Sequence, residues 1–372
     1  MRSFARTIVL SAAIAAIPFL IPGSASAAVW TGGTGGTNTT WLTGTNWDTG
    51  SAPQNVGDDA TFNTKGSIAN PNFTTTKSIS TVTFNGSGWN IDGYNTINLR
   101  GITLSATNAT AGISPAVKMD VPFGVSVASG STLSFNGGFT FSNQAMTKDG
   151  LGTAYLNASG NPTIKTITVN AGTLRLNGTH TAGTFTTPSL SVGANGTLAG
   201  SATVGVPASV SGTVSPGDTT VTTGLLTMSG ASTFNSGSTL EMQLNGLTVG
   251  TNYDQYATNG LTLNTTSLAL ALGFDPTVGN AFTLVDNTSA SAVVGLLKMG
   301  TTTLAEGSTF DLTNPTTTNL FRFQLSYVGS TGVGSTGNDI VATVVPIPEP
   351  STFTMLAMGI ASFVACRRRR MA

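Results

Sequence analysis

Cysteine, histidine and charge are all scarce in this chain of 372 residues. It contains one cysteine and one histidine, and charged residues make up 8% of it. One cysteine excludes a disulfide framework, so the fold must be stable without covalent cross-links. One cysteine and one histidine also exclude the Cys and His clusters that bind zinc, and the sequence predicts neither a metal site nor a cofactor.

The few charges are unevenly distributed. Six of the 15 basic residues are Arg2, Arg6 and Arg367–Arg370. Residues 28–345 therefore hold nine basic residues against 14 of the 15 acidic ones, a net charge of −5. A mildly acidic body argues against nucleic acid and anionic membrane surfaces as partners, because both bind basic patches.

Groups suited to catalysis are equally few. His180 lies in "NGTHTAG" without an acidic or nucleophilic neighbour, which indicates a solvated loop histidine. Asp58 and Asp59 in "VGDDATF" could form an acid/base pair, or join Asp48 around Ca²⁺. Adjacent strand residues point to opposite faces, however, so a turn capped by aspartate is the favoured interpretation.

The first 27 residues have the pattern of a secretory signal peptide. Two arginines precede an apolar run from Ile8 to Ile21, and small residues end at Ala25-Ser26-Ala27. This order predicts cleavage by signal peptidase after Ala27. A retained N-terminal anchor is the alternative, which Pro18 and Pro22 disfavour.

The other end combines an apolar run with a basic cluster. Phe353–Cys366 contains no charged residue, and Arg367, Arg368, Arg369 and Arg370 follow it directly. Residues 351–366 are predicted to form a short transmembrane helix, marginal for a hydrocarbon core of about 30 Å. Basic residues after a span stay in the cytoplasm, which places the body outside and the arginines inside.

The order of elements in this tail resembles the PEP-CTERM protein-sorting signal. Pro348, Glu349 and Pro350 precede the apolar run and the arginine cluster, all within residues 346–372. The resemblance implies that an exosortase, a membrane-embedded processing enzyme, recognises Pro348-Glu349-Pro350 and removes or exchanges the tail. It also implies transient anchoring in the inner membrane and a final location at the cell surface or in the extracellular matrix.

The body has short alternating strands separated by Gly and Asn. In "TIKTITVNAGTLRLNG" Ile167 and Val169 alternate, Asn170–Gly172 turns, and Leu174 and Leu176 alternate again. Related phrases recur near Gly130, Gly172, Gly196 and Gly237, at intervals that fit one or two turns of a coil of about 20–24 residues. The sequence thus predicts an all-β protein, a parallel β-solenoid (β-helix) with roughly seven rungs over residues 100–250. A β-sandwich remains the alternative.

Residues 148–178 resemble the autotransporter-associated β-strand repeat. The match is carried by Gly150, Gly152, Thr153, Leu156, Gly172, Thr173 and Leu174. Ala154-Tyr155 and Pro162 depart from the usual pattern. The resemblance implies a passenger-like β-solenoid.

These observations divide the chain into five parts. They are a signal peptide (1–27), an N-terminal β cap with the first rungs (28–99), a β-solenoid (100–247), a C-terminal capping β-domain (248–345) and the sorting signal (346–372). In the N-terminal part, Trp30, Trp41, Trp47 and Phe62 are spaced to cap an open first rung.

Two functions follow as hypotheses. The favoured one is a non-enzymatic, exported protein with a structural or adhesive role that contacts exopolysaccharide or neighbouring cells. The alternative is a carbohydrate-active β-helix enzyme with an unrecognised carboxylate pair. A minor idea concerns Thr81-Val82-Thr83 and Thr166-Ile167-Thr168, which would present hydroxyls from one face as flat ice-binding solenoids do.

Overall fold

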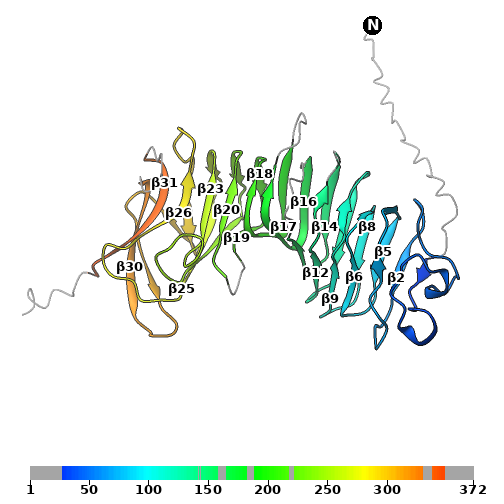
Figure 1. Ribbon diagram of the computed structural model, residues 1–372. Coiled ribbons are helices and arrows are strands. Elements are labelled where there is room, and N and C mark those ends of the chain that lie inside the picture. Colours follow the sequence, from blue (N-terminus) through cyan, green and yellow to red (C-terminus); the bar gives the residue numbers. More distant parts are fainter. Residues whose placement is uncertain are drawn as a thin grey trace, which may run out of the picture.

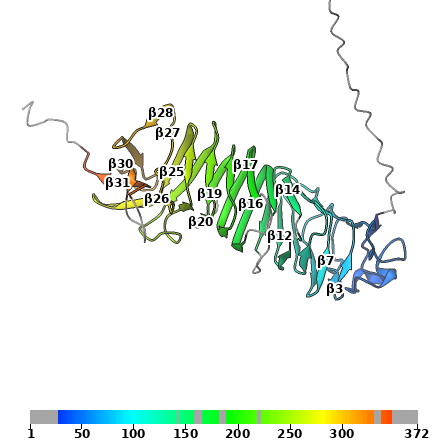
Figure 2. The same cartoon turned by 90° about the horizontal axis from the view of Figure 1, so that it is seen from above.

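The computed structural model describes residues 27–140, 142, 144–157, 165–181, 188–217, 222–329 and 337–347. Its regular structure consists of 31 strands and two short 3-10 helices. Strands stack in parallel to form an elongated coil, shown side-on in Figure 1 and from above in Figure 2. The predicted parallel β-solenoid is confirmed, and the β-sandwich is not the fold.

Each rung contributes strands to three sides of the coil. The first side contains β1 (Ala28–Val29), β2 (Ala60–Phe62), β5 (Thr81–Phe84), β8 (Gly101–Leu104), β11 (Phe123–Val127), β14 (Ala145–Asp149), β18 (Ala208–Val210), β21 (Ser232–Phe234) and β24 (Leu261–Leu263). Two long strands, β16 (Thr166–His180) and β17 (Ser189–Val204), begin on this side between β14 and β18 and continue around the corners.

The second side contains β3 (Asn72–Phe73), β6 (Trp89–Gly93), β9 (Thr110–Ile113), β12 (Thr132–Phe135), β15 (Thr153–Leu156), β19 (Thr213–Pro216), β22 (Thr239–Leu244), β25 (Thr266–Leu272) and β27 (Leu297–Met299). The third side contains β4 (Lys77–Ser78), β7 (Thr96–Asn98), β10 (Ala116–Lys118) and β13 (Phe139–Thr140), and later β20 (Leu225–Met228), β23 (Gln255–Thr258) and β26 (Ala281–Asn287).

The length of a rung follows from the strand register. Ile102 pairs with Val125, and Val125 with Lys148, a step of 23 residues each time. Met146 then pairs with Ile167 after 21 residues. Seven strands of the first side, β8, β11, β14, β16, β17, β18 and β21, lie within residues 100–250. The seven rungs agree with the sequence prediction, and so does the rung length from β2 to β17. Beyond β17 the step departs from the predicted length of about 20–24 residues, being 18 from Leu190 to Ala208 and 29 from Ser232 to Leu261.

Period-two alternation explains why these segments coil. In β5, Val82 and Phe84 are buried while Thr81 and Thr83 are partly exposed, and β12 repeats the pattern. Each inward side chain stacks on its register partner in the next rung, so one continuous apolar core runs along the coil.

The corner at residues 169–172 differs from the expected turn. Asn170–Gly172 does not separate two strands, because β16 continues through it with a register shift between Val169 and Ala171. Gly172 has φ +64°, and a Cβ there would lie 2.4 Å from the carbonyl oxygen of Gly152. The chain bends while its backbone stays paired to the next rung, which a residue with a Cβ would prevent.

An aromatic cluster closes the N-terminal end. The 3-10 helices η1 (Thr34–Gly36) and η2 (Gly44–Asn46) lie in the loop that carries it. The rings of Trp30 and Trp47 lie 5.1 Å apart, and those of Trp41 and Trp47 lie 4.8 Å apart. Trp41 also contacts Phe73 at 5.2 Å, so the cluster covers the apolar core where it would otherwise meet water.

Antiparallel strands close the C-terminal end. They are β28 (Thr302–Leu304), β29 (Thr309–Thr313), β30 (Leu320–Gly329) and β31 (Asp339–Val345). β26 pairs in parallel with β23 through one edge and antiparallel with β31 through the other. β27 likewise pairs in parallel with β25 and antiparallel with β28, so the change from parallel to antiparallel pairing lies at β26 and β27, between residues 281 and 299.

Several predicted segments fall outside the described residues. These are most of the signal peptide, the motif at residues 348–350, the transmembrane segment at 351–366 and the arginine cluster at 367–370. Within the ranges that the structure describes, no helix is long and apolar enough to span a membrane.

Candidate functional site

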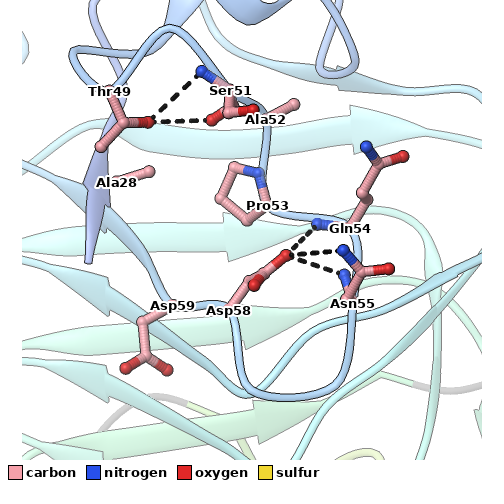
Figure 3. Close-up of a pocket in the computed structure, with 9 residues that line it drawn as sticks. All are labelled: Ala28, Thr49, Ser51, Ala52, Pro53, Gln54, Asn55, Asp58 and Asp59. Carbon is pink, nitrogen blue, oxygen red and sulfur yellow. Dashed lines mark hydrogen bonds between the residues drawn. The ribbon is translucent and has the colours of Figure 1, made fainter. Parts of the chain in front are cut away.

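A polar pocket opens at the N-terminal end of the coil (Figure 3). It lies between the start of β1 and the loop that leads into β2, and has a volume of about 340 Å³. Its lining consists of Ala28, Thr49, Ser51, Ala52, Pro53, Gln54, Asn55, Asp58 and Asp59. The two carboxylates that the sequence singled out therefore share one pocket.

Hydrogen bonds hold both carboxylates in the wall of this pocket. Oδ2 of Asp58 accepts the backbone N–H groups of Gln54 and Asn55 at 3.0 and 2.9 Å. Oδ1 of Asp59 accepts the N–H and the hydroxyl of Thr81 at 3.0 and 2.6 Å, which ties β2 to β5 in the next rung. The turn capped by aspartate is confirmed for Asp58, and Asp59 links two rungs.

Asp48 also has a structural role, which differs from those of Asp58 and Asp59. Its Oδ1 accepts the backbone N–H of Val29 at 2.8 Å, and its own N–H donates to the Val29 carbonyl oxygen at 3.0 Å. Asp48 thus covers the edge of β1 instead of joining Asp58 and Asp59 around an ion. Over the described ranges no group of three or more His, Cys, Asp and Glu side chains is placed to hold a metal.

Lys148 is a buried charge that the sequence analysis did not select. It occupies an inward position of β14, between Val125 and Val169 in the register. Its Nζ donates to the carbonyl oxygens of Asp149, Gly150 and Ala171 at 2.9, 2.8 and 3.0 Å. Burial lowers the pKa of Lys148 to about 8, against the opposing effect of the Asp149 carboxylate. The ammonium group therefore stabilises the corner after β14 and links it to the next rung.

His180 corrects a sequence expectation. It is fully buried at the end of β16, in register with Val204, and is not a solvated loop residue. Its Nε2 lies 3.2 Å from the carbonyl oxygen of Asn177. Burial lowers its pKa, because the charged imidazolium is poorly solvated there. Among the described residues, the hydrogen-bond partner of His180 is a backbone carbonyl and not a carboxylate.

Among the described carboxylates, Asp254 has the largest shift in pKa. Its oxygens accept the N–H groups of Gly224 and Gln243, both at 2.7 Å. Burial raises the pKa of Asp254 to about 7, and nearby Glu241 adds to the shift while the two N–H donors oppose it. Gly224 lies directly before β20 and Gln243 lies in β22, so this carboxylate links two segments of backbone and organises the fold.

The residues that carry the resemblance to the autotransporter-associated repeat lie at and beside one corner of the coil. Gly152, Gly172 and Gly196 follow each other in register, beside the outward column of Thr153, Thr173 and Thr197. At Gly150 and Gly152 a Cβ would lie 2.3 and 2.2 Å from carbonyl oxygens of the preceding rung. Leu156 and Leu174 are buried.

The processing residues are placed only in part. Ala27 is exposed directly before β1 begins at Ala28. Ala25, Pro348, Glu349, Pro350 and Arg367–Arg370 lie outside the described residues.

Comparison with known proteins identifies the tail. Residues 346–370 match the family model of the PEP-CTERM protein-sorting motif. No curated protein matches the chain. A parallel β-solenoid thus carries a PEP-CTERM motif at its C-terminal side, and that motif implies an exosortase-sorted, extracellular protein.

Proposed function

We propose that this protein is an exported β-solenoid that acts at the cell surface or in the extracellular matrix as a structural or adhesive element, without catalysis. The observation that carries the proposal is the PEP-CTERM match at residues 346–370 on a solenoid body. Two further features support it. The described carboxylates in the N-terminal pocket serve the fold, and the outward columns carry mainly Thr, Ser and Asn.

Export and sorting would use both termini. Signal peptidase would release the body after Ala27, and residues 351–366 with Arg367–Arg370 would anchor it transiently in the inner membrane. Exosortase would then act at Pro348-Glu349-Pro350. Two prolines in this motif lack backbone N–H donors and disfavour helix, which would suit binding in an enzyme cleft.

A rigid body suits a structural or adhesive role. Exposed asparagines bridge successive rungs: Asn157 Nδ2 donates to Asn136 Oδ1 at 3.2 Å, and Asn177 Nδ2 donates to Asn157 Oδ1 at 2.8 Å. Such ladders stiffen the coil without placing like charges in neighbouring rungs. The expected contacts are exopolysaccharide and neighbouring cell surfaces.

Substitution at the sorting motif tests this proposal. With Glu349→Ala we expect full-length protein to accumulate in the inner-membrane fraction, because the anchor is no longer removed. Asp120→Ala is a matched control, since Asp120 is an acidic residue of the body that pairs with Lys118 on the surface. Fractionation and mass spectrometry of the C-terminus give the result, and release of Glu349→Ala at the rate of the control would refute exosortase sorting.

A carbohydrate-active enzyme is the second candidate, and the pocket containing Asp58 and Asp59 favours it. Such an enzyme would release reducing sugar from a polysaccharide, and Asp58→Asn or Asp59→Asn would abolish the release. Turnover that behaves in this way would replace the non-catalytic proposal.

A further inference from the structure

A shallow trough lies on the outer surface of the first side of the coil. It spans strands of four successive rungs and has a volume of about 210 Å³. Its lining consists of Thr81, Gly101, Ile102, Thr103, Gly124, Val125, Ser126 and Asp149. This surface is distinct from the pocket at the N-terminal end.

Two glycines create the trough. Thr81, Gly101, Gly124 and Thr147 follow each other in register, so an outward column of side chains is interrupted for two rungs. At about 4.8 Å per rung, the gap between the two threonines is about 14 Å long. The interruption also breaks the regular double row of threonines that a flat ice-binding face would need.

The fold does not require glycine at position 124. Gly124 is not among the glycines with positive φ, and a Cβ built on it would meet no atom within 4 Å. Gly150 and Gly172 behave differently, because each has a positive φ and a Cβ there would collide with backbone. Glycine in the middle of a strand lowers stability. Its presence here costs stability without a packing reason, which is typical of a position kept open for contact.

The wall of the trough carries side chains that form hydrogen bonds. Thr103, Ser126 and Asp149 follow each other in register and form a half-buried to exposed column beside the gap. They offer two hydroxyls and a carboxylate, and Oδ1 of Asp149 accepts from Asn170 Nδ2 at 2.9 Å. No Lys or Arg belongs to the lining. An anionic ligand would be repelled by Asp149, and the apolar groups of the lining suit the C–H face of a sugar ring.

We propose that this trough binds a segment of an uncharged polysaccharide, with one sugar ring over Gly124, which is exposed while Gly101 is buried. The backbone floor contacts the C–H face of the ring, the hydroxyls of Thr103 and Ser126 exchange hydrogen bonds with sugar hydroxyls, and Asp149 accepts from them. The volume lies below the roughly 300–1,000 Å³ of sites that enclose small molecules, which suits one unit of a long chain lying across the surface. Binding is weak per site and becomes effective through many displayed copies.

This inference rests on the proposed adhesive function and names its ligand class. The test uses purified protein, so its result is independent of export and sorting in cells. Affinity electrophoresis through gels that contain dextran or a soluble β-glucan measures binding to neutral polymers, and alginate serves as the anionic probe. We expect retardation in at least one neutral gel and none in alginate.

A side chain introduced at position 124 would fill the gap and show whether binding can be lost while the fold is kept. Gly124→Val is expected to weaken binding at least tenfold while the melting temperature stays the same or rises, because valine suits a strand and finds free space. Gly138→Val is the matched control: Gly138 also lacks positive φ, its nearest contact for a Cβ is 4.0 Å away, and it lies outside the trough, so this variant should bind like the wild type.

Asp149→Asn provides a second variant on an exposed side chain. It is expected to weaken binding to the neutral polymer and to remove the discrimination against alginate. Three results would overturn the site: no retardation by either neutral polymer, equal retardation by alginate, or full binding by a folded Gly124→Val protein. Failure here leaves exosortase sorting unaffected, whereas the Glu349→Ala experiment tests sorting alone.

Discussion

The two ends of the solenoid are closed by different means. At the N-terminal end β1 has two residues, and closure depends on the packed rings of Trp30, Trp41 and Trp47. At the C-terminal end the backbone itself changes direction, because β26 gives one edge to β23 and the other to antiparallel β31. Side-chain volume closes one end and strand pairing closes the other.

This difference has consequences for stability. Each rung of a solenoid contacts only its neighbours, so a defect at one end should remain local. The N-terminal closure concentrates its stabilisation in a few large side chains. The C-terminal closure spreads it over the backbone hydrogen bonds of β29, β30 and β31, together with stacked rings such as Phe310 and Phe323 at 5.6 Å.

The largest effect is expected from Trp41→Ala. Trp41 is buried, contacts Trp47 and Phe73, and donates its Nε1–H to the Pro53 carbonyl oxygen at 2.8 Å. Truncation of a buried tryptophan costs about 3–5 kcal/mol. Hydrogen exchange should show lost protection in β1, β2 and β5, with β29–β31 unchanged.

A matched variant at the other end completes this comparison. Phe310→Ala removes a buried ring from β29, but the antiparallel pairing of β29 with β30 remains. Its loss of protection should be confined to the C-terminal strands and smaller than that of Trp41→Ala at the N-terminal end. Equal loss of protection at both ends in either variant would contradict local closure.

The sequence predicted the repeating part of the fold better than its exceptions. Period-two alternation at Ile167, Val169, Leu174 and Leu176 is enough to predict the rungs, because only inward apolar residues can stack. His180 lies at an alternate position from Leu174 and Leu176, but Gly178 between them is exposed, and the Asn-Gly and Thr residues suggested a loop. The series of alternate positions from Leu174 was the signal that could have placed it in the core.

Sites that depend on register could not be read from the sequence. Gly101 and Gly124 become neighbours only when the rung length is known to the residue, and the interval between register partners varies along the coil. The same applies to Lys148, whose three acceptors include Ala171 of the next rung. The sorting motif is different, because Pro348-Glu349-Pro350 and its apolar and basic neighbours form a linear pattern.

A smaller, pH-dependent change in stability is expected from Asp254 and Lys148, which lie in different parts of the coil. Folding raises the pKa of Asp254 from 3.8 to about 7, so the folded state binds its proton more tightly than the unfolded state. The resulting stabilisation is present below about pH 4 and is lost as pH rises to about 7. Folding lowers the pKa of Lys148 from 10.5 to about 8, so stability is gained as pH rises between these values.

Denaturant unfolding across pH, combined with hydrogen exchange, checks both signs. Asp254→Asn should remove the decrease in the free energy of unfolding between pH 4 and 7, and hydrogen exchange should show the change in β20, β22 and β23. Lys148→Met should remove the increase in the free energy of unfolding between pH 8 and 10.5, and hydrogen exchange should show the change in β14 and β16. If the free energy of unfolding still changes with pH in the corresponding variant, another group titrates in that pH range.

The smallest effect is expected at the exposed edge of β1. Asp48 covers this edge by accepting the Val29 N–H at 2.8 Å, and β1 pairs with β2 through its other edge. Asp48→Ala should cost about 1 kcal/mol, the usual net value of one such hydrogen bond. Asp48→Asn keeps an oxygen acceptor and should restore most of the loss. Because the tryptophan cluster remains intact in both variants, exchange should increase at Val29 and Trp30 while β5 keeps its protection; increased exchange in β5 would mean that edge pairing, and not ring packing, closes the N-terminal end.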